Sequence, residues 1–78
     1  MEKLKKTIIK IIGKELDVPT RSIKDDTSIQ DDLGADSLDV INIVMTIENN
    51  FNIEIDEDIL TDFNTIGDIV KRLSTVIS

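Results

Sequence analysis

Residues 33–51 read LGADSLDVINIVMTIENNF and hold both the start of a helix and the pattern of its faces. Asp36 is a good N-cap residue, because its short side chain can accept a hydrogen bond from the unpaired N–H groups of a helix start. Asp39 follows three residues later and gives part of a capping box. Asparagines cluster after position 48 and indicate where the helix ends. The stretch therefore predicts a helix from about Ser37 to Asn50.

The predicted helix has apolar side chains on two faces. At about 100° per residue, five of them share one face and can fill a core: Val40, Ile43, Val44, Ile47 and Phe51. Leu38, Ile41 and Met45 fall on the opposite side, which Asp39 and Glu48 flank. A helix in so small a domain needs one apolar face, so either other helices cover both faces or the second face is a docking strip. We favour a strip that binds an apolar groove rimmed by Lys and Arg.

Helical spacing also occurs before this segment, and it predicts an amphipathic helix over about residues 3–16. The apolar residues on its core-facing side are Leu4, Ile8, Ile11 and Ile12. Pro19 prevents this helix from continuing. Residues 17–36 form a long connection, and we expect it to be an ordered loop that apolar residues pin to the core: Ile23, Ile29 and Leu33.

Two more helices are predicted in the last third of the chain. The acidic residues 56–58 suit the positive end of a short helix that continues to position 60. Thr65 and Asp68 form another capping-box pattern. Apolar residues then follow at helical spacing: Ile66, Ile69, Val70, Leu73 and Val76. Residues 52–56 alternate like a strand, but the sequence offers no second strand to pair with them.

These patterns predict one all-α domain over residues 1–78. We expect a four-helix bundle with three longer helices, one short helix and a long ordered loop between helices one and two. The N-terminal lysines and isoleucines faintly resemble a signal peptide, but Lys10 and Lys14 interrupt the apolar run. No stretch approaches membrane-spanning length, and we expect a cytoplasmic monomer that does not insert into membranes.

Charge is distributed unevenly along the chain. Residues 1–24 carry seven basic and three acidic side chains, whereas residues 25–70 carry thirteen acidic side chains and no Lys or Arg. The acidic segment would repel phosphates, so we exclude nucleic acid as its partner. A basic protein surface is its natural complement, although the acids could also serve only to keep the protein soluble.

The clusters of carboxylates also suggest a calcium-binding protein. An EF-hand loop that starts at Asp62 would place Gly67 correctly at its sixth position. It fails because Ile66 and Leu73 would stand where oxygen ligands are required. We therefore predict no specific metal site, with weak binding of divalent cations as a secondary property.

The chain contains no histidine and no cysteine, which removes the usual general base and the usual soft metal ligands. Ser37 is therefore presented at a helix start without a base that could activate it as a nucleophile. We expect no catalytic residues and no enzyme activity. An unactivated hydroxyl at the positive end of a helix suits an acceptor of a phosphate-linked group that another enzyme attaches. The alternative is an interaction domain in which Ser37 stays bare.

The sequence resembles acyl carrier proteins of the dissociated, bacterial fatty-acid type over essentially the whole chain. The specific match is DDLGADSLD at residues 31–39, in which the family's Asp-Ser-Leu motif aligns with residues 36–38. It continues through Val44, Met45, Glu48 and Phe51. KIIG at residues 10–13 looks like the family's first helix, and IEI at residues 53–55 looks like its loop before helix three.

This resemblance implies that Ser37, framed by Asp36, carries phosphopantetheine through a phosphodiester. A phosphopantetheinyl transferase would add this arm from coenzyme A. The thiol of the arm would hold growing acyl chains as thioesters and deliver them to the enzymes of fatty acid biosynthesis. Family members also shelter the chain between their helices, and the implied lining residues are Val40, Val44, Ile47, Ile55, Ile59, Leu60 and Ile69.

The resemblance further implies that partner enzymes recognise the helix that begins at Ser37. Its carboxylates would meet basic patches, and its exposed strip would make apolar contacts. The implied partner-binding residues are Leu38, Asp39, Ile41, Met45 and Glu48. The chain departs from the family at Asn42, Asn49 and Asn50, where acids are common, and these changes could weaken particular partner contacts. Asp56 replaces a frequent proline, a change that we expect to matter less.

Peptidyl, polyketide and D-alanyl carriers share a serine at this position and a similar fold. Gly-Ala-Asp before Ser37 and the dense acids after it favour fatty-acid synthesis. We expect Asp39→Lys to reduce transfer of the arm to Ser37 with little loss of stability, because Asp39 lies beside the apolar strip.

Overall fold

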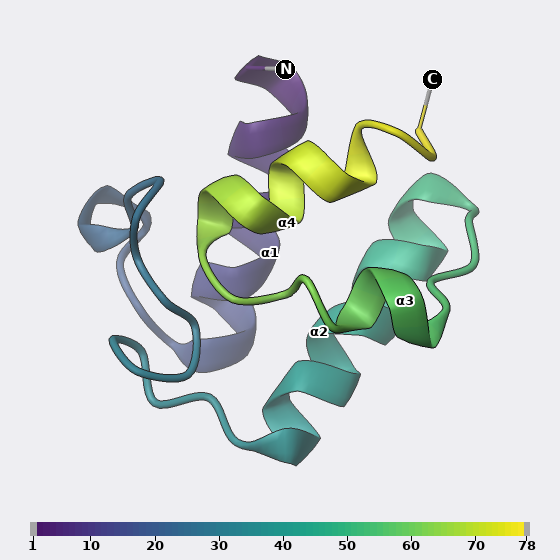
Figure 1. Ribbon diagram of the computed structural model, residues 1–78. Helices are drawn as coiled ribbons and strands as arrows, with labels where there is room; N and C mark the ends of the chain where they lie inside the picture. The colour runs from purple at the N-terminus through teal and green to yellow at the C-terminus, as the bar shows by residue number, and fades with distance from the viewer. Residues whose placement is uncertain (1, 78) are drawn as a thin grey trace.

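The computed structural model describes residues 2–77, and this part of the chain is all-helical (Figure 1). Its elements in chain order are α1 (Glu2–Leu16), the short 3₁₀ helix η1 (Thr20–Ser22), α2 (Ser37–Phe51), α3 (Glu57–Leu60) and α4 (Ile66–Leu73). The β-type pairing found in residues 2–77 is an isolated antiparallel bridge between Ser28 and Thr65. The predicted all-α fold, with three longer helices and one short one, is confirmed.

The helix boundaries agree with the sequence pattern except at the end of α4. We expected the apolar spacing to continue the helix as far as Val76, but α4 ends at Leu73 and Val76 is exposed in the turn that follows. The hydroxyls of Ser74 and Thr75 donate to the carbonyls of Lys71 and Arg72 in the last turn. Such side-chain bonds to the backbone compete with continuation of a helix.

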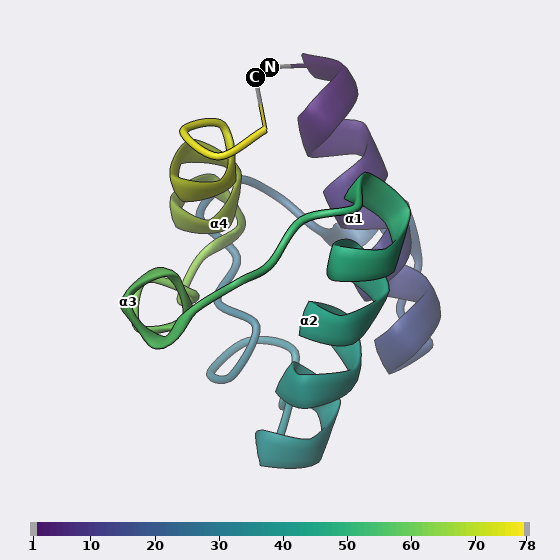
Figure 2. The same ribbon diagram turned by 90° about the vertical axis from the view of Figure 1, so that its right-hand side faces the viewer.

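The core lies where α1 packs against both α2 and α4 (Figures 1 and 2). Its largest fully buried side chains are Ile8, Ile12, Ile29, Ile43, Ile47, Ile66, Ile69 and Leu73. Burying each of them stabilises the fold by roughly 1.5–3 kcal/mol relative to leaving it exposed. The single turn α3 joins this core through Ile59, and Phe63, three residues after the end of α3, is buried in the same core.

The long loop between α1 and α2 is held against the start of α4 by backbone hydrogen bonds. The N–H of Ile29 donates to the carbonyl of Asn64 at 3.0 Å, and the N–H of Ile66 donates to that of Thr27 at 3.0 Å. The N–H of Gly67 donates to the carbonyl of a loop aspartate, Asp25, at 2.8 Å. Ile29 is fully buried, so the expectation of an ordered loop pinned to the core is confirmed. The sequence did not predict η1, which lies within this loop.

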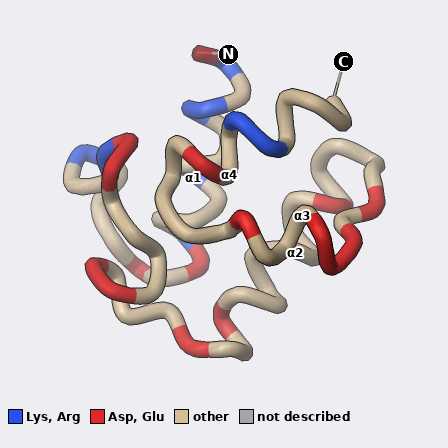
Figure 3. The backbone as a smooth tube through the Cα atoms, in the orientation of Figure 1, with Lys and Arg blue, Asp and Glu red and all other residues tan. Residues whose placement is uncertain are grey.

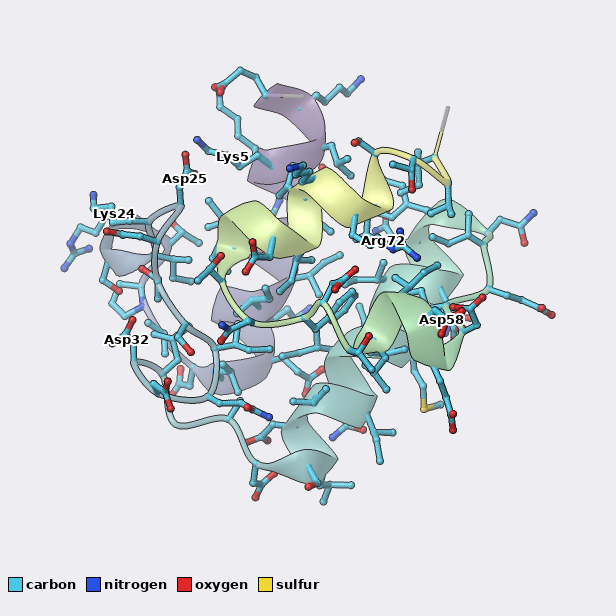
Figure 4. The ribbon with its side chains drawn as sticks, viewed as in Figure 1. Lys5, Lys24, Asp25, Asp32, Asp58 and Arg72 are labelled. Atoms are coloured by element: carbon cyan, nitrogen blue, oxygen red, sulfur yellow. The ribbon has the colours of Figure 1, made fainter. Side chains whose placement is uncertain are left out.

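An ion pair ties the same loop to α1. Nζ of Lys5 lies 2.8 Å from Oδ1 of Asp25, and Figure 4 shows the two side chains pointing toward each other. The hydrogen bond to the Asp25 carboxylate raises the pKa of Lys5.

Charged side chains are distributed by region. Lys and Arg gather on α1, η1 and the end of α4, while acids are spread over the loops, α2 and α3 (Figure 3). None of the helices in residues 2–77 has the length and apolar character needed to cross a membrane.

Candidate functional site

A complete capping box surrounds Ser37. Oδ1 of Asp36 accepts a hydrogen bond from the N–H of Asp39 at 2.8 Å, and Oδ2 of Asp39 accepts one from the N–H of Asp36 at 3.2 Å. Asp36 has the extended backbone of an N-cap residue, with φ −93° and ψ −176°. Ser37 is therefore the first residue of α2, and it is exposed. The partial box expected from the sequence is present with both of its hydrogen bonds.

These bonds change what Asp39 is expected to do. Asp39 is half-buried as a residue, and its carboxylate accepts a hydrogen bond from the N-cap backbone, in addition to the place beside the exposed strip that the spacing predicted. Asp39→Lys would remove the reciprocal acceptor and reverse the charge at the positive end of α2, so the structure gives a reason to expect a larger stability cost than the sequence alone suggested.

The backbone before Ser37 turns tightly and is anchored in the core. Gly34 has φ +72°, in the left-handed region that glycine adopts without strain. A Cβ at Gly34 would meet no atom within 4 Å, so the position calls for glycine because of its backbone angle and not for lack of space. Ala35 is buried, and its N–H donates to the carbonyl of Ile29 at 2.8 Å. The site is thus attached to the same loop that binds the start of α4.

An apolar hollow opens beside the Ser37 side chain. It has a volume of about 320 Å³ and is lined by Gln30, Ser37, Val40, Ile41, Leu60 and Phe63. Two of these side chains, Val40 and Leu60, belong to the pocket lining that the family resemblance implied. Gln30 and Phe63 were missed. Phe63 repeats the apolar spacing of α3, three residues after Leu60, and that signal was available in the sequence.

The other implied lining residues lie deeper in the molecule. Ile47 and Ile69 are fully buried, and Ile59 is buried. Val44 and Ile55 are half-buried and pack against the same core. These five side chains do not line the hollow beside Ser37 in the described structure. A larger hollow of about 480 Å³, around Asp62 and Arg72, does not include Ser37.

The second apolar face of α2 is open. Leu38 is 64% exposed, Ile41 is 52% exposed and Met45 is 54% exposed. Leu60 of α3 adds a further partly exposed apolar side chain, and it lines the hollow together with Ile41. The alternative that other helices cover this face is therefore excluded within residues 2–77.

Two acids, Glu48 in the last turn of α2 and Asp56 just before α3, accept hydrogen bonds from the backbone. Oε2 of Glu48 accepts from the N–H of Ile55 at 2.8 Å. Oδ1 of Asp56 accepts from the N–H of Ile59 at 3.0 Å and makes Asp56 the N-cap of α3. Where the family often has proline, we expected Asp56 to be a less important departure than Asn42, Asn49 and Asn50. The structure gives its carboxylate a defined role, because it caps the only turn of α3.

The arrangement presents a hydroxyl without supplying a catalyst for it. The chain has no histidine or cysteine, and in residues 2–77 no three of its acidic side chains come together as candidate metal ligands. The two carboxylates nearest Ser37 in the chain accept backbone hydrogen bonds in the capping box. What remains is an exposed Ser37 hydroxyl between an apolar hollow and an apolar strip, a geometry that suits an acceptor of a group attached by another enzyme.

Comparison with known proteins identifies the family of this chain. A family model described as the phosphopantetheine attachment site matches residues 6–73. The acyl carrier protein of Wolinella succinogenes is 38% identical over 68 residues, which cover 87% of this chain and 90% of that protein. The acyl carrier protein of Prochlorococcus marinus is 39% identical over 70 residues, which cover 90% and 88% of the two chains.

A solved structure of similar sequence has the same fold. It is a Mycobacterium tuberculosis chain described as an acyl carrier protein, and it superposes with a TM-score of 0.85 at 26% identity. The match covers 94% of this chain and 97% of that one. The chain therefore belongs to the acyl carrier proteins, which are carriers and not enzymes, and which bear acyl groups on a phosphopantetheine arm.

Proposed function

We propose that Ser37 is the attachment point of the arm and that the loaded protein carries growing acyl chains through fatty acid biosynthesis. The single observation behind this proposal is that Ser37 is exposed at the first turn of α2 and also lines an apolar hollow. In this proposal a phosphopantetheinyl transferase adds the arm from coenzyme A. The Ser37 oxygen attacks the β-phosphate of coenzyme A, loses its proton and displaces adenosine 3′,5′-bisphosphate.

The hollow beside Ser37 is the proposed point where an acyl chain leaves solvent. Its lining is mainly apolar, with Val40 and Ile41 from α2 and Leu60 and Phe63 from or just after α3. Transfer of apolar surface out of water favours this position by roughly 0.8 kcal/mol per buried methylene. A long chain extends further, toward the implied lining residues Val44, Ile47, Ile55, Ile59 and Ile69.

The proposed partner surface is the exposed face of α2. Leu38, Ile41 and Met45 supply the apolar contact, and they stand in a segment that carries acids and no bases. Asp36, Asp39 and Glu48 supply negative charge, which their backbone hydrogen bonds do not remove. Basic patches on the transferase and on the synthesis enzymes complement this charge and would be steered to it. This proposal places the protein in the cytoplasm as a monomer, with divalent cations bound weakly by the acids.

The attachment site is tested by measuring intact mass after incubation with coenzyme A and a broad-specificity transferase. We expect the wild-type protein to gain one phosphopantetheine and Ser37→Ala to gain none. A folded wild-type protein that gains nothing would favour an interaction domain in which Ser37 stays bare.

The pathway is tested separately, because peptidyl, polyketide and D-alanyl carriers would pass the mass test as well. The loaded protein is offered as substrate to a fatty-acid elongation system and to enzymes that charge the other carrier types. We expect turnover with the elongation enzymes at the higher kcat/KM. Preferred charging by an amino-acid-activating enzyme would contradict the pathway while leaving Ser37 as the attachment point.

A further inference from the structure

Glu48 makes a contact that its expected place on a partner surface does not explain. Its carboxylate turns back onto its own chain, where Oε2 accepts a hydrogen bond from the N–H of Ile55, seven residues later, at 2.8 Å. The bond is part-buried, and Glu48 itself is only half-exposed. A short bond to a charged acceptor in such a position is among the stronger hydrogen bonds of a protein.

The segment that this bond holds is also attached by the N–H of Ile53, which donates to the carbonyl of Glu48 at 3.2 Å, and by the half-buried side chains of Ile53 and Ile55, which pack against the core. Between the end of α2 and the start of α3, Asn52 adopts the left-handed conformation with φ +55°, and residues 53–56 then have no regular secondary structure. Asp56 in turn caps α3 through the N–H of Ile59. One acid on α2 therefore fixes the chain just before α3, and a second acid fixes the first turn of α3.

This segment determines where one wall of the hollow lies. Leu60 is the last residue of α3 and Phe63 follows it closely, and both line the hollow beside Ser37. A single turn of helix cannot hold its own position, because isolated helices of that length are unstable in water. The place of this wall depends on the buried side chains Ile59 and Phe63 and on the contacts that fix the chain before them.

We propose that Glu48 is a positioning residue: through its bond to the Ile55 N–H it sets the place of α3, and thereby how firmly the hollow beside Ser37 holds an acyl chain. This role is additional to any contribution of its charge to docking. It rests on the proposed function in so far as the hollow receives the chain, whereas the effect on the Ile55 amide does not depend on that function.

Two substitutions separate geometry from charge. Glu48→Gln removes the charge but keeps an acceptor oxygen at the same distance along the side chain. Glu48→Asp keeps the charge but is one methylene shorter and cannot reach the Ile55 N–H without backbone movement. Both residues are compatible with a helix, so neither change threatens the fold. Glu54, an exposed acid in the same loop, provides matched controls as Glu54→Gln and Glu54→Asp.

The first measurement is amide hydrogen exchange of the unmodified protein by NMR. We expect the Ile55 amide to exchange about tenfold faster or more in Glu48→Asp, and to be accelerated much less in Glu48→Gln, which keeps a weaker, neutral acceptor. Amides of α1 should be unchanged in both variants and in the Glu54 controls. Wild-type exchange at Ile55 in Glu48→Asp, or equally fast exchange in Glu48→Gln, would overturn the proposal.

The second measurement is the cleavage of thioesters by hydroxylamine on the loaded protein. We expect an octanoyl thioester to be cleaved several-fold faster in Glu48→Asp than in wild type or in Glu48→Gln. An acetyl thioester, too short to reach into the hollow, should react equally in all variants. Equal octanoyl rates in the three proteins would refute the acyl-holding role. Failure to load the wild-type protein would instead count against Ser37 as the attachment point.

Discussion

Asp36 and Asp39 each accept a hydrogen bond from the other's backbone N–H, at 2.8 and 3.2 Å, with Ser37 lying between them in the sequence. This reciprocal pair satisfies two polar groups that a helix start leaves unpaired. It also fixes the backbone on both sides of the proposed attachment point. The two acids are thus part of the helix start as well as part of its negative surface.

Asp39→Lys is expected to lower both stability and modification of Ser37. It removes an acceptor from the capping box and places a positive charge at the positive end of α2, which together cost about 1 kcal/mol. Thermal unfolding measures the first effect, and the rate of phosphopantetheine transfer measures the second. Asp39→Asn retains an acceptor oxygen and should keep most of the stability while slowing transfer. Equal transfer rates in the two variants and the wild type would contradict a docking role for this charge.

Asp56→Ala is expected to destabilise α3 without unfolding the molecule. The change removes the acceptor for the Ile59 N–H, and loss of an N-cap typically costs about 1 kcal/mol. Asp58→Ala, two residues further on, removes an exposed acid and serves as the control. Hydrogen exchange of the Ile59 amide should rise in the first variant and not in the second. Equal exchange in the two variants would show that the cap contributes nothing to α3.

Lys5→Gln is expected to lower the unfolding temperature near neutral pH and to lose this effect at high pH. The Asp25 carboxylate raises the pKa of Lys5 above 10.5 in the folded protein. The pair therefore stabilises the fold below the unfolded pKa, and its contribution disappears as pH rises through the raised folded value. Lys6→Gln, an exposed neighbour, controls for the general effect of losing one charge. A difference between these variants that persists at high pH would contradict the ion pair as its cause.

Ile47→Ala is expected to destabilise the protein by about 2–5 kcal/mol, because Ile47 is fully buried and its truncation leaves a cavity. Denaturant unfolding of the unmodified protein measures this cost. Ile47→Val should cost about 0.5–1.5 kcal/mol. A loss of less than 1 kcal/mol in Ile47→Ala would mean that the surrounding core collapses onto the vacated space.

Met45→Gln is expected to leave stability unchanged within about 0.5 kcal/mol, because the Met45 side chain is 54% exposed. It should raise the KM of the transferase for the protein, since it removes apolar contact area from the proposed docking strip. Asn49→Gln, at an exposed position further along α2, provides the control. An unchanged KM would exclude Met45 from the surface that the transferase contacts.

Residue spacing was sufficient to find α2 because every relationship that defines it is local. The Asp36–Asp39 box joins positions three apart, and the separation of Ile43 from Ile41 onto opposite faces follows from 3.6 residues per turn. The same spacing predicted an α4 that is too long, because Val76 continues the apolar period. The observed helix ends at Leu73, where the hydroxyls of Ser74 and Thr75 donate to backbone carbonyls. Gln30 was missed because it joins the hollow from a loop without any periodic pattern.

By itself, the sequence determined the four α-helices, the capping boxes of α2 and α4, the buried and exposed faces of α2, and the place of Ser37 at its start. These follow from contacts within about one helical turn, and such contacts can be read from spacing. Only the tertiary structure decided that the loop binds the start of α4, that Phe63 and Ile41 line one hollow with Ser37, and that Glu48 reaches the Ile55 N–H. Those contacts depend on where packing places segments that are distant or irregular in the chain, and side-chain periodicity contains no information about that placement.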